Sequence, residues 1–569
     1  MKTFFFVPKQ NTSDDSTRDI FEEYGNAFKK ADIPNVELVS FDRIQFFLSD
    51  TIKDIQEESL FMVPSILDSF NAFSYGGVEL ALKIYFHYAS AKNNKFQIIV
   101  LGTEEEYAFW EHCRYSSILK CPHVGFIQNN IYSIQNYLLK VEPIDWNIDW
   151  DECIERLKRL NVSKPASYKT HHSITNEWSI YRWSKYLSIE NIAIQKDIEE
   201  FLYFNYLKAI YPESKIDNPK SFLIAEKGKV LLIDDEVGKG WHTFFMSFLS
   251  FSHSVTFDSI GSNFKNLSKE DIIAQTEAKI KEFDPDVVLL DLRLHDTDFE
   301  DKSPSELTGA KVFEKIKNYN KGIQIVIFSA SNKVWNYLPF ASDGVILKES
   351  PELSVRDNYT QECIKNMLET LRISLGKGSF LSKLFRDVES IKANLHNNDF
   401  GSSISKQFDL SFLLISKAET EEQFAFSYVA LYQTIEIITD ELITKEQHQS
   451  NPVVNKWKLS DGTYIHEYKW DSQKKLYQDL GEAQSGKEPF PQWKKMAGLV
   501  LQKWAIPNGD GFVHNLSFLI EKRNGFIHND KTILDKQDKN TRKYLNHDIY
   551  DKSGFKSLFD SIKTICSYL

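Results

Sequence analysis

The sequence predicts a multidomain fold, with two α/β domains built on parallel sheets, a helical connector between them, and an all-α domain at the end. Short apolar runs alternate with helix-like stretches over residues 1–140 and again over residues 226–375. This alternation is typical of a parallel sheet that helices cover on both faces. Apolar residues make up 42% of the 569 residues, which is enough to give each domain a core.

The first α/β domain is expected over residues 1–140 and the connector over residues 141–225. The expected strands of the first domain are TFFFV, VELVSF, SLFMV, FQIIVLG and HVGFIQ, and GGVELALKIYFHYA is one of its helices. In the connector, the stretches DECIERLKRL, NEWSIYRWSKYL and DIEEFLYFNYLKAI have the apolar spacing of helices. The aromatic residues of NEWSIYRWSKYL are expected to pack against the α/β domains.

The second α/β domain is expected over residues 226–375, with KVLLID, SVTFDSI, DVVLLDLRL, IQIVIFSAS and GVILKE as its strands. It resembles the first domain weakly but in the same order, since FQIIVLG matches IQIVIFS and GGVELALKIY matches TGAKVFEKIK. This order predicts a duplicated fold. Residues 376–569 show no convincing run of strands, and QFAFSYVALYQTIEIITDELI and HNLSFLIEKRNGFIH predict a helical bundle.

Polar residues follow the strands of the second α/β domain at their carboxyl ends. Asp234 and Asp235 follow KVLLI, Asp291 follows DVVLL, and Ser329 and Lys348 follow the last two strands. Ligands of open parallel sheets bind beyond this edge. Carboxylate oxygens at this density suit Mg²⁺, and a metal ion beside a carboxylate and a lysine can hold a phosphoryl group.

This arrangement resembles the receiver domain of two-component response regulators over about residues 228–375. The resemblance implies a flavodoxin-like fold with a five-stranded parallel sheet, in which Asp291 takes a phosphoryl group from a histidine kinase or a phosphotransfer protein. It implies these further roles: Mg²⁺ binding by Asp234, Asp235, Asp291 and the backbone carbonyl of Arg293, and phosphoryl binding by Ser329 and Lys348. Glu349 departs from the proline of the family, and Val345 stands where many members carry a switching aromatic residue. The structural alternative is an acidic edge that never meets phosphate.

The first α/β domain lacks these residues. Val7 and Pro8 stand near the place of the acidic pair, and Pro64 near that of the phosphoacceptor. Gly102 and Gln128 replace the hydroxyl residue and the lysine. We therefore expect a degenerate receiver-like domain that serves dimerisation or partner recognition, with an unrelated flavodoxin-like fold as the alternative.

The string FLIEKRNGFIHND in the last domain contains Arg523, Asn524 and His528. It resembles the HEPN superfamily, many of whose members are metal-independent ribonucleases. The resemblance implies that these three residues are catalytic, that the substrate is RNA, and that the helical domain forms a homodimer. Histidine can move the proton of a 2′-hydroxyl and arginine can stabilise a charged phosphate. A second string with the same spacing, from Arg542 to His547, shows that the pattern also arises by chance.

Taken together, these patterns predict a cytoplasmic response regulator whose phosphorylated receiver controls a ribonuclease, in stress response or defence against phage. The alternative is a non-catalytic, phosphorylation-dependent adaptor whose helical domain dimerises or binds a partner protein. The net charge of −12 excludes a chain that attracts nucleic acid over its whole surface. No apolar stretch reaches the roughly 18 residues of a membrane span, so no membrane partner is expected.

The five cysteines favour a reduced, cytoplasmic chain because their number is odd and they are scattered. Four possible zinc ligands lie close together in EHCRYSSILKCPH, namely His112, Cys113, Cys121 and His123. Structural zinc sites usually place paired ligands two to four residues apart, so ordinary packing is the preferred interpretation.

Overall fold

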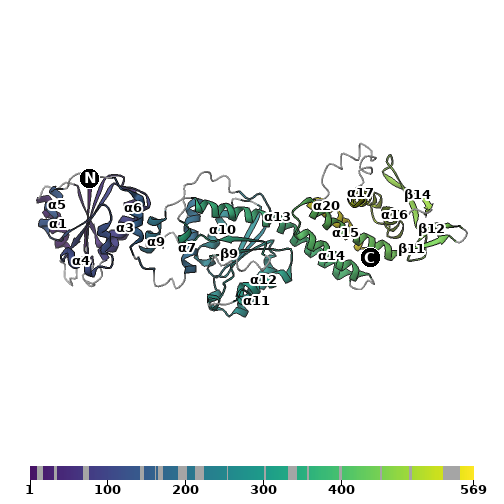
Figure 1. Ribbon diagram of the computed structural model, residues 1–569, viewed down its shortest axis with the longest axis horizontal. Coiled ribbons are helices and arrows are strands. Elements are labelled where there is room, and N and C mark those ends of the chain that lie inside the picture. The colour runs from purple at the N-terminus through teal and green to yellow at the C-terminus, as the bar shows by residue number, and fades with distance from the viewer. Residues whose placement is uncertain are drawn as a thin grey trace. The chain divides into compact units, whose positions relative to one another are not determined.

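The computed structural model describes most of the chain (Figure 1). The described residues are 1–8, 17–30, 35–67, 76–140, 147–160, 162–164, 171–189, 202–211, 223–250, 252, 254–299, 303–330, 342–354, 358–395, 400–448, 451–485, 490–528 and 551–569. They divide into two compact units, one formed by Met1–Lys315 and Gln324–Gly376, the other by Ile316–Ile323 and Lys377–Leu569. Within the described residues, no helix is long and apolar enough to cross a membrane.

The first sheet contains five parallel strands in the order β2-β1-β3-β4-β5. Its strands are β1 (Lys2–Val7), β2 (Val36–Ser40), β3 (Ser59–Pro64), β4 (Phe96–Gly102) and β5 (Val124–Gln128). Its helices are α1 (Thr17–Lys30), α2 (Ile44–Ser49), α3 (Gly76–Ser90), α4 (Glu106–His112) and α5 (Ile131–Lys140). Successive residues of a strand point to opposite faces, so Phe4 and Phe6 enter one core cluster and Phe5 and Val7 the other.

The second sheet also contains five parallel strands, in the order β10-β9-β8-β6-β7. Its strands are β6 (Gly228–Ile233), β7 (Val255–Ile260), β8 (Val287–Leu290), β9 (Gln324–Ser329) and β10 (Gly344–Leu347). Its helices are α10 (Trp241–Ser250), α11 (Lys269–Phe283), α12 (Thr308–Tyr319) and the long α13 (Tyr359–Asn394). In both sheets the first strand lies between the second and the third, which confirms two five-stranded parallel sheets of the flavodoxin-like kind.

The connector contains α6 (Trp150–Lys158), α7 (His171–Tyr186) and α9 (Leu202–Ile210). Helix α6 begins after Asp149, whose carboxylate accepts hydrogen bonds from the backbone N–H groups of Asp151 and Glu152. Helix α9 packs on α3 of the first domain, whereas α7 packs on α10 of the second. The aromatic residues of α7 are core residues, as expected, because the Trp183 ring lies 5.6 Å from that of Trp241.

The second unit is mainly helical. Besides the C-terminal part of α13, its helices are α14 (Gly401–Ser416), α15 (Glu421–Leu442), α16 (Gln492–Ala497), a π-helical turn (Gly498–Lys503), α17 (Gly509–His528) and α20 (Lys552–Cys566). Apolar side chains from these elements form one core cluster, separate from those of the first unit.

The expectation that residues 376–569 hold no strands is wrong. The structure has β11 (Ile443–His448), β12 (Asn451–Leu459), β13 (His466–Asp471), β14 (Leu476–Glu482) and β15 (Gln484–Ser485). Strands β11, β12 and β15 form one antiparallel sheet, and β13 and β14 form another. These strands alternate a few aromatic residues, such as Tyr468 and Tyr477, with charged ones, so they contain no apolar run. The sequence features that indicate these strands are that alternation and the Asp461-Gly462 turn, where Gly462 has a φ of +93°.

Candidate metal and phosphoryl site

Three carboxylates meet beyond the carboxyl ends of β6 and β8. Asp234, Asp235 and Asp291 each offer an oxygen, and these oxygens all lie within 4.8 Å of one another. The sheet register explains this proximity, since Ile233 of β6 pairs with Leu290 of β8 and the aspartates directly follow these residues. The structure therefore brings together the three carboxylates that the sequence placed at two strand ends.

Lys348 reaches the same cluster from the end of β10. Its Nζ lies 2.7 Å from Asp234 Oδ2 and 3.3 Å from Asp291 Oδ2, and its side chain is fully buried. The Phe328 ring covers it, with 4.5 Å between Nζ and the ring centroid. Burial alone would lower the pKa of Lys348, but the ion pairs with Asp234 and Asp291 outweigh burial and raise it. Lys348 is therefore a permanent positive charge in the site.

Ser329 and Arg293 lie at the border of the cluster. Ser329 is the last residue of β9 and is buried, and its carbonyl accepts a hydrogen bond from the backbone N–H of Lys348, 2.8 Å away. The backbone N–H of Arg293 donates to Asp291 Oδ1 over 3.2 Å. All the residues expected at this edge thus lie at or beside it, and the loop after β8 folds back onto Asp291.

Asp235 has an oxygen atom with no partner. The residue is only 8% exposed, and its Oδ1 is buried without a hydrogen bond. Burial, together with the nearby Asp234 and Asp291 carboxylates, raises the pKa of Asp235 to about 9. A buried carboxylate without a partner costs free energy, and a divalent cation that prefers oxygen ligands would offset this cost. The donor set therefore fits a cation such as Mg²⁺.

Glu236 follows the aspartate pair but points away from the cluster, to the connector helix α7. Its carboxylate accepts hydrogen bonds from Ser173 Oγ (2.7 Å) and Asn176 Nδ2 (2.6 Å), and Lys239 lies 2.9 Å away. Its backbone N–H donates to Asp234 Oδ1 over 2.8 Å. Sequence reasoning missed this role because the partners of Glu236 lie about 60 residues earlier in the chain.

Glu349, the residue after Lys348, also binds α7. Its carboxylate is fully buried and accepts hydrogen bonds from Arg182 Nε (3.3 Å), Trp183 Nε1 (3.1 Å), Ser354 Oγ (2.7 Å) and Thr360 Oγ1 (3.0 Å). Glu349 therefore makes a second contact between the loops of the acidic edge and the connector.

The corresponding edge of the first domain has a different chemistry. Val7, Pro64, Gly102 and Gln128 end β1, β3, β4 and β5. The Phe126 ring occupies the space beside Gly102, where an added Cβ would lie 2.0 Å from Phe126 Cζ. Gln128 donates to the carbonyl of Glu104 over 3.1 Å. Among the described residues, carboxylates that could share a metal ion gather only at the second sheet.

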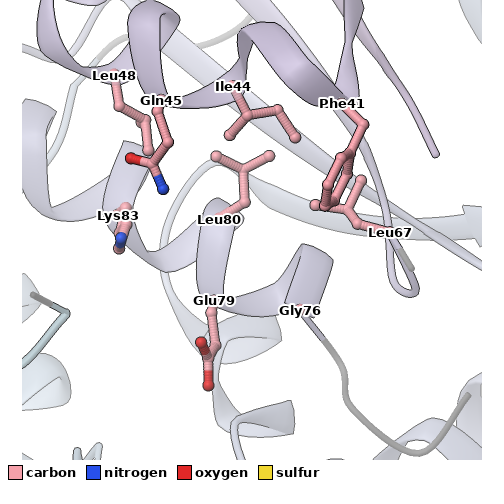
Figure 2. A pocket seen from close by; sticks show the side chains of 9 residues that line it. All are labelled: Phe41, Ile44, Gln45, Leu48, Leu67, Gly76, Glu79, Leu80 and Lys83. Carbon is pink, nitrogen blue, oxygen red and sulfur yellow. The ribbon is translucent and has the colours of Figure 1, made fainter. Parts of the chain in front are cut away.

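The first domain instead has a cleft of about 320 Å³ between α2 and α3 (Figure 2). Ile44 and Leu48 of α2 and Leu80 of α3 form its apolar wall, and Gln45, Glu79 and Lys83 are its polar residues (Figure 2). The residues that line this cleft are far from the acidic cluster in the sequence. The side chains of Gln45, Glu79 and Lys83 do not point to a common position (Figure 2).

The buried cysteines are packing residues. All five cysteines are free thiols, and burial raises the pKa of Cys113 to about 11 and that of Cys121 to about 12. His123 Nδ1 contacts the carbonyl of Phe96 at 3.0 Å. These thiols therefore stay protonated near neutral pH, in agreement with the interpretation as ordinary packing.

In the second unit, Arg523, Asn524 and His528 all belong to α17. Arg523 Nη2 lies 3.1 Å from Glu436 Oε1 of α15, and its guanidinium lies 4.6 Å from the centre of the Tyr432 ring. The side chains of Asn524 and His528 lie outside the described residues, as does the second string from Arg542 to His547. The structure therefore pairs the arginine of the motif with a carboxylate of the same unit.

Comparison of the chain with protein-family models gives no match, and comparison with curated proteins gives none either.

Proposed function

We propose that the second α/β domain is a phosphorylatable receiver, that Asp291 accepts the phosphoryl group, and that the helical unit carries the output. The observation that carries this proposal is the buried cluster at the sheet edge, in which Lys348 pairs with two carboxylates and Asp235 keeps an oxygen without a partner. A structural ion pair would need one carboxylate, whereas this cluster has three. The surplus negative charge favours a cation site.

The residues present can carry out phosphoryl transfer. An oxygen of Asp291 forms a bond to phosphorus while the P–N bond of a phosphohistidine donor breaks. The imidazole leaves with the bonding electron pair and takes up a proton from water. Lys348, 3.3 Å from Asp291 Oδ2, is placed to bind an oxygen of the new phosphoryl group, and Ser329 stands on the adjacent strand. A Mg²⁺ ion held by Asp234, Asp235 and Asp291, with the Arg293 carbonyl, would supply positive charge for the phosphoryl oxygens.

The phosphorylation test compares wild-type protein with Asp291→Asn, using acetyl phosphate and Mg²⁺ and detecting the adduct by intact mass. Asp296→Asn is the matched control, because Asp296 is exposed and lies in the same loop. We expect a mass increase of one phosphoryl group, which hydroxylamine removes, in the wild type and the control, and none in Asp291→Asn. An adduct that persists in Asp291→Asn would show that another residue is the acceptor.

For the output we propose a HEPN-like, metal-independent ribonuclease that acts as a homodimer, based on Arg523, Asn524 and His528 on α17. The test is cleavage of a mixed RNA pool in EDTA, with and without prior phosphorylation. We expect Arg523→Ala and His528→Ala to lose at least about 100-fold in rate, since the first removes a group that stabilises transition-state charge and the second removes a general acid-base group. Arg542→Ala, from the second string, is the control and should cleave as the wild type does.

One observation favours the adaptor as a second candidate. The Arg523 guanidinium already has a carboxylate partner in Glu436 and a ring beneath it in Tyr432, so its charge is satisfied inside the unit. In a phosphorylation-dependent adaptor, the ion pair between Arg523 and Glu436 would only stabilise the fold. No RNA cleavage by the wild type or by His528→Ala would support the adaptor, whereas equal cleavage by both would show that His528 is not catalytic.

A further inference from the structure

Helix α7 is held to the second α/β domain at two glutamates that border the proposed phosphorylation site. Glu236 directly follows the aspartate pair, and Glu349 directly follows Lys348. Both glutamates are almost completely buried, at 4% and 0% exposure. We call these two contacts the Glu236 clamp and the Glu349 clamp.

The Glu236 clamp joins α7 to a proposed cation ligand through a single residue. The Glu236 carboxylate binds Ser173 and Asn176, while its backbone N–H donates to Asp234 Oδ1 over 2.8 Å. Asn176 also accepts a hydrogen bond from Trp241 Nε1 over 2.8 Å. The Trp241 ring in turn lies 5.4 Å from Lys348 Nζ. The N-terminal part of α7 therefore contacts two neighbours of the acidic cluster.

The Glu349 clamp joins α7 to the first α/β domain as well. Arg182 Nε donates to Glu349 Oε1 over 3.3 Å, and Arg182 Nη1 donates to the carbonyl of Tyr211 over 3.3 Å. Tyr211 directly follows α9, which packs on α3. The Trp178 ring adds an edge contact to Tyr211, at 6.2 Å between centroids. Arg182 thus links the loop after Lys348 to the helix that covers the first domain.

Asp234 has both oxygens occupied in the observed state. Oδ1 accepts the N–H of Glu236, and Oδ2 accepts Lys348 Nζ. A cation that binds Asp234 must share or replace one of these bonds. Loss of the bond from the Glu236 N–H disturbs Glu236, which binds α7. Loss of the bond from Lys348 disturbs the residue before Glu349, which also binds α7.

We propose that α7 couples the state of the acidic cluster to the first α/β domain, so that cation and phosphoryl binding loosen the two clamps and alter the packing of α7 and α9. This inference rests on the proposed function of the cluster. It assigns the receiver a second output, directed toward the N-terminal domain and separate from any output through the helical unit. Because coupling between sites is reciprocal, weakening a clamp must also change cation affinity.

The test uses full-length protein and measures two quantities. Hydrogen exchange of the amides in α7 and α9 is followed with EDTA, with Mg²⁺, and with Mg²⁺ plus beryllium fluoride as a phosphoryl substitute. Mg²⁺ affinity is measured by calorimetry. The variants are Ser173→Ala and Glu236→Gln, which weaken one clamp without a large change in volume. Lys185→Ala is the control, because Lys185 is exposed on the same helix.

We expect exchange in α7 and α9 of the wild type and of Lys185→Ala to accelerate at least about fivefold when Mg²⁺ and beryllium fluoride bind. We expect the clamp variants to bind Mg²⁺ about tenfold more tightly, which corresponds to about 1.4 kcal/mol. Unchanged exchange in a protein that binds Mg²⁺, together with wild-type affinity in both clamp variants, overturns the coupling and leaves the phosphorylation proposal intact. If neither the wild type nor any variant binds Mg²⁺, both the coupling and the proposed function of the cluster are overturned. The comparison of EDTA with Mg²⁺ tests the coupling even if Asp291 takes no phosphoryl group.

Discussion

At the scale of single residues, the site is governed by how buried charges are balanced. Lys348 offsets the charge of one of the three carboxylates, and Asp235 keeps a buried oxygen without a hydrogen-bond partner. Its raised pKa means that folding without a cation favours the protonated acid, because burial penalises the charged form. Asp235 therefore destabilises the metal-free protein, and a bound cation would give its carboxylate a partner.

Asp235→Asn should stabilise the protein in EDTA by about 1–3 kcal/mol at neutral pH, since an amide needs no proton uptake on folding. The folded pKa is raised, so the unfolded state holds fewer protons, and the wild type loses stability as pH rises from about 4 toward 9. The difference between wild type and variant should therefore grow with pH in that range. Urea denaturation at pH 5, 6.5 and 8 measures it, with Asp296→Asn as the exposed control. A difference that shrinks with pH would contradict the proposed state of Asp235.

In the presence of Mg²⁺, the wild type should become more stable than Asp235→Asn. Mg²⁺ should stabilise the wild type, because a ligand that binds only the folded state adds to its stability. Asp235→Asn should show little of this effect, since one of its three carboxylates is lost. Melting temperatures at increasing MgCl₂, with matched NaCl for ionic strength, measure the effect. Equal stabilisation of both proteins would exclude Asp235 as a ligand.

At the scale of elements, the sheets could be predicted from the sequence and the contacts of α7 could not. The strand ends of β6 and β8 follow from apolar runs such as VLLI and VVLL, and parallel pairing then places Asp234 beside Asp291. Nothing local in the sequence indicates that Arg182 meets Glu349, because the two lie 167 residues apart. The strands from Ile443 to Ser485 were missed for a different reason. Exposed polar residues such as Lys469 and Asp479 interrupt them, so no apolar run marks them.

The Glu349 clamp gives a prediction at this scale. Arg182→Ala should destabilise the protein by about 3–5 kcal/mol, because it leaves the Glu349 carboxylate buried without its charge partner. The double variant Arg182→Met with Glu349→Leu should recover most of this loss, since both charges are then absent. Guanidinium denaturation followed by tryptophan fluorescence measures the difference. A double variant as unstable as Arg182→Ala would show that the pair acts mainly through packing.

The first α/β domain gives another prediction. Gly102→Ser adds a hydroxyl at the end of β4. It should destabilise the domain by about 1–3 kcal/mol, because its Cβ would meet the Phe126 ring. The companion variant Gly102→Ser with Phe126→Ala tests the cause, since removing the ring makes room. Thermal denaturation measures both, and a neutral Gly102→Ser would show that Phe126 moves aside easily.

At the scale of the whole molecule, the proposed homodimer requires a contact surface on the helical unit. Leu410 and Leu413 of α14 are 44% and 52% exposed, an arrangement that favours burial against another surface. Leu413→Glu should therefore weaken the dimer at least about tenfold, as measured by sedimentation at several concentrations. Tyr132→Glu, on the exposed face of α5, is the control. A monomeric wild type, or a dimer unaffected by Leu413→Glu, would place the contact elsewhere or exclude it.

The two buried glutamates also decide where the chain can be cut for expression. A fragment that begins at residue 226, where the sequence suggests the start of the second α/β domain, would lack α7. It would keep Glu236 and Glu349 but lose Asn176, Arg182 and Trp183 as their partners. Such a fragment would expose apolar surface and leave two buried carboxylates without their partners on α7, so it should aggregate or remain partly folded. The smallest autonomous unit that contains the second α/β domain therefore begins before residue 171, because the acidic edge shares buried contacts with α7.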